Sequence, residues 1–246
     1  MTESDDVLDK IHLDVFDTQV EHRMTYELYY WPTIQGRGEF VRLALEEAGA
    51  EYIDAARESE GVAVMMRMME GADHPPFAPP FLKDGETVIG QTAAILLYLG
   101  ARHGLAPKDP AGGLWTHQIQ LTIGDFVAEA HDTHHPVGVG LYYEDQKQEA
   151  LRRAQEFRDS RIPKFLNWFE TILARNPSGD RHLVGLSLTY VDLSLFQVIE
   201  GLSYAFPKTT KRALKKAPRV AALHDAVTER PRIKSYLSSP RRIPFN

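Results

Sequence analysis

The chain contains no cysteine among its 246 residues. A disulfide framework, a thiolate zinc site and a cysteine nucleophile are therefore excluded, and any sulfur chemistry needs a sulfur atom from a bound ligand. Long apolar runs are also missing. The longest nearly apolar stretch is Ala93 to Ala101, whereas a membrane span needs about 20 residues, so we expect no membrane segment.

A surplus of basic residues is missing as well, because the formal net charge is −6. Residues 1–23 hold seven acidic and two basic residues, a net of −5, which leaves −1 for the remaining chain. A nearly neutral body gives no support for nucleic-acid binding. The basic stretch from Lys208 to Lys216 is interpreted as a solvated helix face. Since the acidic N-terminus carries no apolar core segment, we expect no signal peptide and a cytoplasmic location.

The sequence indicates two domains. Hydrophobic residues make up 43% and charged residues 25%, the mix of a globular protein with a sizeable core. Residues 1–23 are interpreted as an acidic extension, residues 24–104 as a small α/β domain, and residues 114–246 as an all-helical domain. The proline- and glycine-rich segment from Leu105 to Gly113 is the predicted linker.

The α/β part begins with a βαβ unit. Aromatic residues from Tyr26 to Tyr30 predict a strand, helical spacing predicts a helix over Gly38 to Ala48, and Glu51 to Ala56 is a second strand. Two strands joined by such a crossover should be parallel. The segments predicted to follow are a short helix over 65–69, a hairpin over 81–89 and an apolar helix over 91–103.

Helical periods dominate beyond the linker. The predicted helices cover residues 114–130, 145–175, 189–205 and 219–227. Pro163 lies inside the second of them and should kink or split it. Thr189 and Asp192 have the spacing of a capping box, with Asp where Glu or Gln is usual, and their expected role is structural.

Tyr30 stands where the first strand ends, just before Gly36, Arg37 and Gly38 open a helix. A helix N-terminus carries about half a unit of positive charge and stabilises an anion placed there. A neutral phenol can donate one hydrogen bond to such an anion, and Arg37 can add positive charge. The alternative is an aromatic strand end that covers the core beside a solvated arginine.

Two further segments each allow a functional and a structural interpretation. Pro79 and Pro80 precede the hairpin, and a cis bond to Pro80 would expose main-chain groups of the preceding residue, although trans is the commoner form. Gln91 and Thr92 open an apolar helix, where Thr92 suits the N-cap and the free N–H groups suit a carboxylate. An ordinary helix cap is the alternative.

A histidine cluster follows the first helix of the second domain, with His131, His134 and His135 close in sequence to Asp125 and Asp132. Two histidines four residues apart on a helix can share a metal ion. The HExxH pattern is absent, however, and a proline ends the helix at once. We expect no metal here and interpret the histidines as cleft lining or as solvent-exposed side chains.

Taken in order, these segments resemble the glutathione transferase family. The resemblance covers roughly residues 24–240, and it rests on Tyr30-Trp31 with Gly36 to Glu39, on Pro80 to Gly85, on Gly90 to Leu99, and on Thr189 with Asp192. The tyrosine class fits best, with sigma- and mu-like members nearest. The resemblance implies a thioredoxin-like N-terminal domain followed by a helical-bundle domain. It also implies an enzyme that binds glutathione as co-substrate, stabilises its thiolate and conjugates it to a small hydrophobic electrophile, with no other cofactor.

The resemblance further implies roles for single residues. Tyr30 matches the tyrosine whose hydroxyl donates to the glutathione sulfur, and Arg37 matches an arginine near that sulfur in some classes. Trp31 matches an aromatic position beside the bound peptide. Pro80 matches the family's cis-proline, so that Pro79 would offer its carbonyl to the glutathione backbone.

Gln91 and Thr92 match the pair that holds the γ-glutamyl group. Asp125 matches an acid that, in some classes, reaches the ligand of the partner subunit, which implies a homodimer. The electrophile is expected between the domains, near Trp31 and four further residues, Ile34, His131, His134 and Tyr142.

Departures from the family pattern leave alternatives open. The loop after Tyr30 is one residue longer than in the tyrosine classes, which makes Tyr29 the alternative, although strand alternation puts it on the opposite face. Met65 to His74 lacks the Trp and Lys that elsewhere hold the glycine carboxylate, and Arg67 and His74 are the candidates to replace them. A non-catalytic glutathione-binding or interaction protein on the same fold is the alternative function. A glutathione-dependent isomerase or peroxidase would use the same thiolate.

Overall fold

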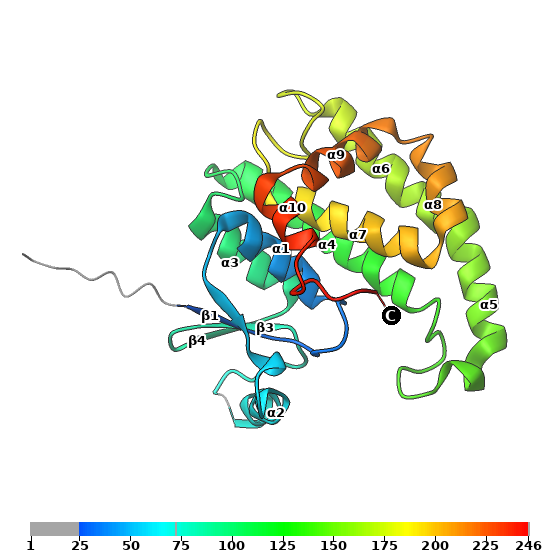
Figure 1. The fold of residues 1–246 in the computed structure, drawn as a ribbon. Helices are drawn as coiled ribbons and strands as arrows, with labels where there is room; N and C mark the ends of the chain where they lie inside the picture. The colour runs from blue at the N-terminus through cyan, green and yellow to red at the C-terminus, as the bar shows by residue number, and fades with distance from the viewer. Residues whose placement is uncertain (1–24, 72, 246) are drawn as a thin grey trace, which may run out of the picture.

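The computed structural model describes residues 25–71 and 73–245, and the extension predicted over residues 1–23 lies outside them. A four-stranded sheet with its helices comes first along the chain, and a bundle of helices follows (Figure 1). The predicted fold class, a thioredoxin-like domain followed by a helical domain, is confirmed.

The sheet is mixed, with the strand order β2-β1-β3-β4. As predicted, β1 runs parallel to β2, whereas β3 is antiparallel to both β1 and β4. Leu28 in β1 pairs with Asp54 in β2 and with Leu82 in β3. The strands cover Tyr26–Tyr29 (β1), Tyr52–Asp54 (β2), Phe81–Asp84 (β3) and Thr87–Gly90 (β4).

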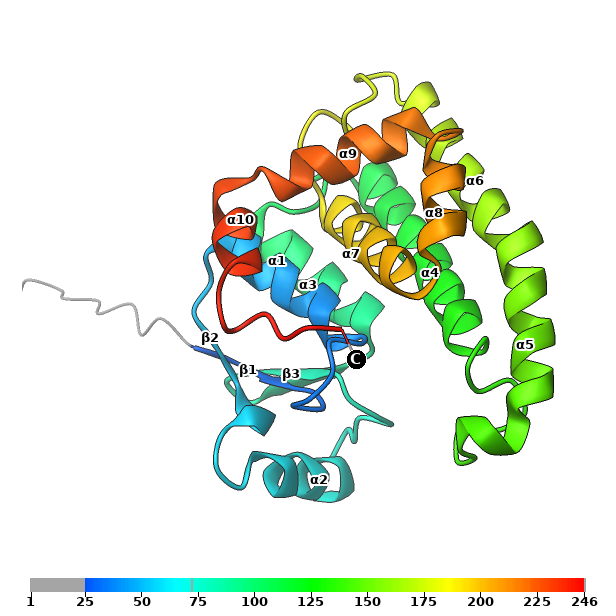
Figure 2. The same cartoon turned by 45° about the vertical axis from the view of Figure 1, so that its right-hand side comes forward.

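Helices cover both faces of the sheet. Helices α1 (Gly38–Ala48) and α3 (Thr92–His103) lie on the face toward the helical domain, and α2 (Gly61–Gly71) lies on the other, after a short 3-10 turn, η1 (Ala55–Arg57) (Figure 2). Because side chains alternate along a strand, Leu28 enters the large core beneath α1 and α3. Tyr29 joins Met65 and Phe81 in a separate small core.

Seven helices and two shorter turns make up the described part of the second domain. Helix α7 occupies its centre and is buried over most of its length, whereas the others surround it. Within residues 25–71 and 73–245, every helix is too short or too polar to span a bilayer. The elements are α4 (Pro110–His131), η2 (Tyr143–Gln146), α5 (Lys147–Glu156), η3 (Phe157–Arg161), α6 (Ile162–Arg175), α7 (Tyr190–Ala205), α8 (Pro207–Leu214), α9 (Pro218–Thr228) and α10 (Pro231–Leu237).

Two helices differ in their bounds from the predicted ones. Helix α4 begins at Pro110, inside the predicted linker, because the Asp109 side chain caps it by accepting the Gly112 N–H at 2.7 Å. The long helix predicted over residues 145–175 is interrupted by the π-helical turn η3, which ends two residues before Pro163. Proline has no N–H to continue the ladder and is tolerated here in the first turn of α6.

The capping box at the start of α7 is confirmed. The buried Asp192 carboxylate accepts the Thr189 N–H at 2.7 Å and the Leu183 N–H at 2.8 Å. It therefore ties the preceding loop to the central helix, which is the structural role predicted for it.

A pair formed by His224 in α9 and Glu200 in α7 makes the stability of the fold depend on pH. His224 contacts Glu200 at 2.9 Å and stacks on Phe196. Burial alone would lower the pKa of His224, but hydrogen bonds to Glu200 and Asp225 outweigh it and raise that pKa. A raised histidine pKa stabilises the fold below about pH 6.5, and this contribution disappears as the pH rises through the folded-state value.

We therefore expect His224→Gln to reduce the loss of stability that the wild-type chain shows between pH 6 and pH 8.5. Urea unfolding of both proteins at the two pH values checks this. Equal pH dependence in the two proteins would contradict the assignment of the charged pair.

Candidate functional site

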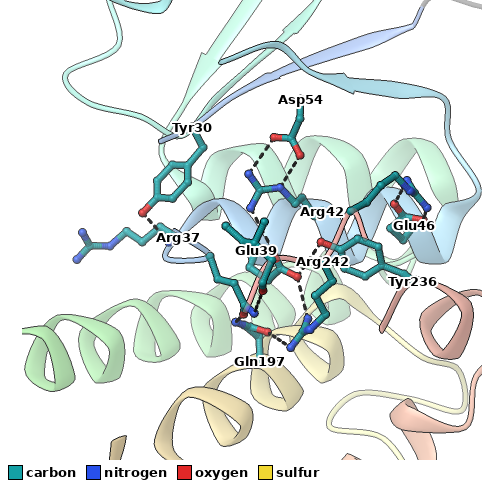
Figure 3. Close-up of polar contacts among 12 residues, drawn as sticks. Tyr30, Arg37, Glu39, Arg42, Glu46, Asp54, Gln197, Tyr236 and Arg242 are labelled. Atoms are coloured by element: carbon teal, nitrogen blue, oxygen red, sulfur yellow. Dashed lines mark hydrogen bonds and ion pairs between the residues drawn. The ribbon is translucent and has the colours of Figure 1, made fainter. Parts of the chain in front are cut away.

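Tyr30 lies one residue beyond β1, with its hydroxyl at the N-terminus of α1 (Figure 3). Its oxygen accepts the backbone N–H of Arg37 at 2.9 Å, and only 6% of the residue is exposed. Because the oxygen is used as an acceptor, its own proton remains available for a second partner. The structure thus presents one phenolic donor where the helix dipole favours an anion.

Two glycines create the space that the Tyr30 ring occupies. A Cβ atom at Gly36 would lie 2.1 Å from the Tyr30 hydroxyl oxygen, and one at Gly38 would lie 2.6 Å from ring carbons. Gly36 also has a φ of +41°, which favours glycine. The Gly36-Arg37-Gly38 sequence therefore fits this one tyrosine.

The protonation state of Tyr30 follows from its surroundings. Burial raises its pKa, while the Arg37 N–H and the charges of Arg37 and Arg42 act in the opposite direction. The guanidinium carbon of Arg42 lies 6.0 Å from the centre of the Tyr30 ring. Since burial prevails, the phenol stays neutral at physiological pH and acts as a hydrogen-bond donor.

Tyr29, the alternative to Tyr30, points elsewhere. Its ring stacks on Phe81 in the small core on the α2 side, with a centroid distance of 4.7 Å. Its hydroxyl donates to the Glu27 carboxylate at 2.5 Å. The structure thus gives the two adjacent tyrosines different partners and opposite faces.

A cavity of about 440 Å³ lies beside the N-termini of α1 and α3. The Pro79–Pro80 bond in its wall is cis. Six of the residues implied to bind glutathione line this cavity, namely Arg37, Pro79, Pro80, Gln91, Thr92 and Asp125. Asp125 is exposed and faces the cavity of its own chain.

The N-cap of α3 is Gln91 rather than the expected Thr92. Gln91 has a φ of +65°, a value that non-glycine residues rarely adopt, and its side chain makes no capping bond. The Thr92 hydroxyl instead lies 3.5 Å from the Arg37 carbonyl oxygen, at the limit of a hydrogen bond. Strained backbone of this kind persists where its surroundings hold it, often at binding sites.

A second cavity, of about 990 Å³, lies between the domains and adjoins the first, because Arg37, Phe40 and Val127 line both. Tyr30 faces this larger cavity. Three of the side chains expected around an electrophile also line it, namely Ile34, His131 and His134.

The remaining predicted residues lie outside both cavities. Trp31 is 39% exposed and Tyr142 is 83% exposed, and neither lines a wall, whereas Tyr143 lines the larger cavity. The candidates for a glycine carboxylate, Arg67 and His74, also line neither cavity. Which of the adjacent Tyr142 and Tyr143 faces the cavity depends on the conformation of a turn. Turns have no periodic pattern, so the sequence could not show which of the two it is.

The described residues contain no group of three or more His, Cys, Asp or Glu side chains arranged to hold a metal ion. The histidines of the larger cavity instead contact one another. His134 and His135 form a hydrogen bond of 3.1 Å, and the His131 and His135 rings stack.

A buried ionic network lies beside Tyr30 and was not predicted (Figure 3). Arg42 makes two bonds of 2.8 Å to Asp54 and one of 3.1 Å to Glu39. Glu39 in turn accepts from Tyr236 and Arg242, each at 2.8 Å. The spacing of Glu39 and Arg42 was visible in the sequence, but their partners lie up to 203 residues away.

The C-terminal segment also reaches the larger cavity. Gln35 joins it to α7, because its side chain donates to the Ile243 carbonyl and accepts from Gln197. Phe245 stacks on Tyr204 at 5.2 Å and lines the cavity wall. Phe245 therefore contributes an aromatic surface to the cavity, and nothing in its sequence position signalled this.

Comparison with known proteins identifies this architecture. A family model described as the C-terminal domain of glutathione S-transferases matches residues 131–240. Glutathione S-transferase 1 of Ascaris suum is 29% identical over 223 residues, covering 89% of this chain and 98% of that protein. A glutathione S-transferase of Plasmodium falciparum is 24% identical over 218 residues, covering 86% and 94%. The Pi-class structure from Onchocerca volvulus superimposes with a TM-score of 0.72 at 23% identity, covering 91% and 98%.

The chain is similar to glutathione S-transferases over most of its length and has their fold. Similar proteins also include glutathione S-transferase P 1 of Xenopus laevis and glutathione S-transferase P of Bos taurus, each 26% identical. The narrower sigma- and mu-like assignment stays a prediction. Within the glutathione S-transferase fold of this chain, Tyr30, the cis bond to Pro80 and the start of α3 converge on two adjoining cavities.

Proposed function

We propose that this protein binds glutathione in the smaller cavity, holds its thiol as a thiolate beside Tyr30, and transfers the sulfur to an electrophile in the larger cavity. One observation carries the proposal. The buried Tyr30 hydroxyl accepts the Arg37 N–H at 2.9 Å at the N-terminus of α1, and Arg37 borders both cavities. The relationship to glutathione S-transferases over most of the chain supports the general activity.

The two cavities suit the two substrates. The smaller one presents Arg37, Gln91 and Thr92 at the N-terminus of α3, which match a charged peptide. The larger one has mostly apolar walls, including Ile34 and Phe245, and matches a hydrophobic electrophile. Asp125 would contact the γ-glutamyl amine, either in its own chain or across a dimer. The homodimer and the cytoplasmic location stay predictions.

The chemistry required is modest. A free thiol has a pKa near 8.5 and is only a few per cent ionised at pH 7. Lowering that pKa by about two units takes about 2.7 kcal/mol of preference for the thiolate. A hydrogen bond to a charged group contributes about 1.5–3 kcal/mol, and the helix N-terminus adds to it. The thiolate then attacks the electrophilic carbon, the carbon–sulfur bond forms, and a leaving group such as halide departs with its electron pair.

Titration of glutathione into the purified chain by calorimetry, followed by ultraviolet absorbance of the bound thiolate against pH, tests the proposal. We expect binding at or below millimolar concentration, a thiol pKa well under 8.5, and conjugation of an aryl halide. Binding without turnover would favour the non-catalytic alternative. The absence of binding at millimolar glutathione would refute both.

A substitution at Gly38 tests the position of the Tyr30 ring. An alanine Cβ at Gly38, the first residue of α1, would press on that ring at 2.6 Å. We therefore expect Gly38→Ala to lower kcat/KM for conjugation at least about tenfold, since a misplacement of about 1 Å costs up to a hundredfold. Overpacking of a buried side chain also costs about 1–3 kcal/mol of stability, so the rates are compared at a temperature where thermal unfolding shows both proteins to be folded. A variant with wild-type activity would show that the ring position does not matter.

A further inference from the structure

Gln146 fixes one end of a chain of side-chain hydrogen bonds at the wall of the larger cavity. It is 1% exposed, and its Oε1 accepts the backbone N–H groups of Val137 at 2.9 Å and Gly138 at 3.3 Å. Because backbone N–H groups only donate, this oxygen assignment is unambiguous, and the remaining amide atom is Nε2. It faces three acceptors, the Gly138 and Leu141 carbonyls at 3.1 and 3.2 Å and the His135 Nδ1 at 3.3 Å.

The orientation of Gln146 determines the tautomer of His135. The two protons of the amide NH₂ group are shared among the Gly138 carbonyl, the Leu141 carbonyl and the His135 Nδ1. Because the NH₂ nitrogen cannot accept, a proton on Nδ1 would face it without a partner, and the contact favours an unprotonated Nδ1. The ring proton of His135 is then on Nε2. That atom lies 3.1 Å from the His134 Nδ1, which must accept the bond.

The same reasoning places the proton of His134 on its Nε2. The ring is held in place by Tyr143, on which it stacks at 4.6 Å with an interplanar angle of 19°. Burial and the neighbouring His135 and His131 keep the pKa of His134 below its usual range. His134, an exposed residue, therefore carries a neutral imidazole N–H in the wall of the cavity that Tyr30 also lines.

Resting on the proposed function, we infer that the His134 Nε2–H is a catalytic hydrogen-bond donor to an oxygen of the second substrate, and that this favours α,β-unsaturated carbonyl compounds. His135 and Gln146 are positioning residues that fix the tautomer. The other titratable or charged side chains that line this cavity are Tyr30, Arg37, His131, Tyr143, Arg158 and Tyr204.

The chemistry balances without any further reagent. The thiolate sulfur adds to the β-carbon and the carbon–sulfur bond forms. The π pair of the carbon–carbon double bond becomes a new double bond between the α-carbon and the carbonyl carbon, and the carbonyl π pair moves onto the oxygen. His134 stabilises the resulting enolate oxygen by hydrogen bonding and keeps its proton. The α-carbon then takes a proton from water. Removal of one such donor typically costs about 100- to 1,000-fold in kcat at an enclosed site, and less at an exposed one.

Two electrophiles test the role of His134, an aryl enone that forms an enolate and benzyl chloride, which expels chloride. We expect His134→Phe, which keeps the stacking on Tyr143, to lose about 10- to 100-fold in kcat with the enone. This loss should be at least tenfold larger than the loss with benzyl chloride. His134→Gln, which restores an N–H donor, should recover part of it. Equal losses with both electrophiles would overturn the inference while leaving the proposed function intact. If the wild-type chain converts neither electrophile, both the inference and the proposed function are refuted.

Nitrogen NMR of the histidines tests the positioning residues independently of activity. In the wild-type chain, the ¹⁵N shifts of His134 should show a neutral ring protonated on Nε2. His135→Phe should allow a mixture of the two tautomers and lower kcat with the enone more than KM changes. A His134 ring protonated on Nδ1 or charged at pH 7 in the wild-type chain would overturn the inference.

Discussion

Replacement of Tyr30 by phenylalanine is expected to raise the thiol pKa of bound glutathione by about one to two units. The phenol is the donor that we propose for the glutathione sulfur, and phenylalanine removes only its oxygen. Since a hydrogen bond to a charged group contributes about 1.5–3 kcal/mol, its loss leaves far less thiolate at pH 6.5. The conjugation rate at that pH should fall about 10- to 100-fold.

Measurement of the pH–rate profile separates this effect from misfolding. At high pH the thiol ionises without help, so the rate of Tyr30→Phe should approach that of the wild-type chain. The matched control is Tyr29→Phe, because the Tyr29 hydroxyl donates to Glu27 on the opposite face of the sheet. A normal rate in Tyr30→Phe together with a loss in Tyr29→Phe would reverse the assignment.

Local patterns in the sequence account for much of this architecture. The βαβ unit, the hairpin, the interruption near Pro163 and the capping box at Thr189 all depend on residues close together in the chain. Strand alternation also separated Tyr29 from Tyr30, because neighbouring side chains on a strand point to opposite faces. These features are local, which is why the sequence alone could predict them.

Features that depend on distant segments escaped prediction. The Glu39 partners Tyr236 and Arg242 come from the last helix and the C-terminal segment, and no periodicity links them to α1. Phe245 reaches the larger cavity for the same reason. The positive φ of Gln91 is one that its residue type rarely adopts, and no local pattern in the sequence indicates it.

Removal of the Arg42 guanidinium is expected to have the largest effect on stability. Arg42 and Glu39 are fully buried, and Asp54 is 13% exposed. Arg42→Met would leave the Asp54 carboxylate without its bidentate partner, and Glu39 with Arg242 as its cation. Breaking a buried pair by deleting one partner costs about 3–5 kcal/mol, a large part of the total stability of about 5–15 kcal/mol.

Urea unfolding at pH 7 measures this loss. Arg42→Lys should lie between the wild-type chain and Arg42→Met, because it keeps the charge but cannot form the paired bonds to Asp54. The control is Lys234→Gln, which removes an exposed pair with Glu229 and should change stability by less than about 1 kcal/mol. Similar losses in Lys234→Gln and Arg42→Met would show that burial of the network is not what stabilises it.

Arg42→Met also tests whether the buried network supports the site at Tyr30. Arg42 lies 6.0 Å from the Tyr30 ring centre, and Glu39 follows the two residues that form the N-terminus of α1. If the network serves only stability, folded Arg42→Met should show the wild-type thiol pKa for bound glutathione. We expect a raised pKa, but by less than in Tyr30→Phe, because Arg42 acts through its charge and through the position of α1. The Tyr30 hydroxyl, by contrast, bonds the sulfur directly in the proposed complex.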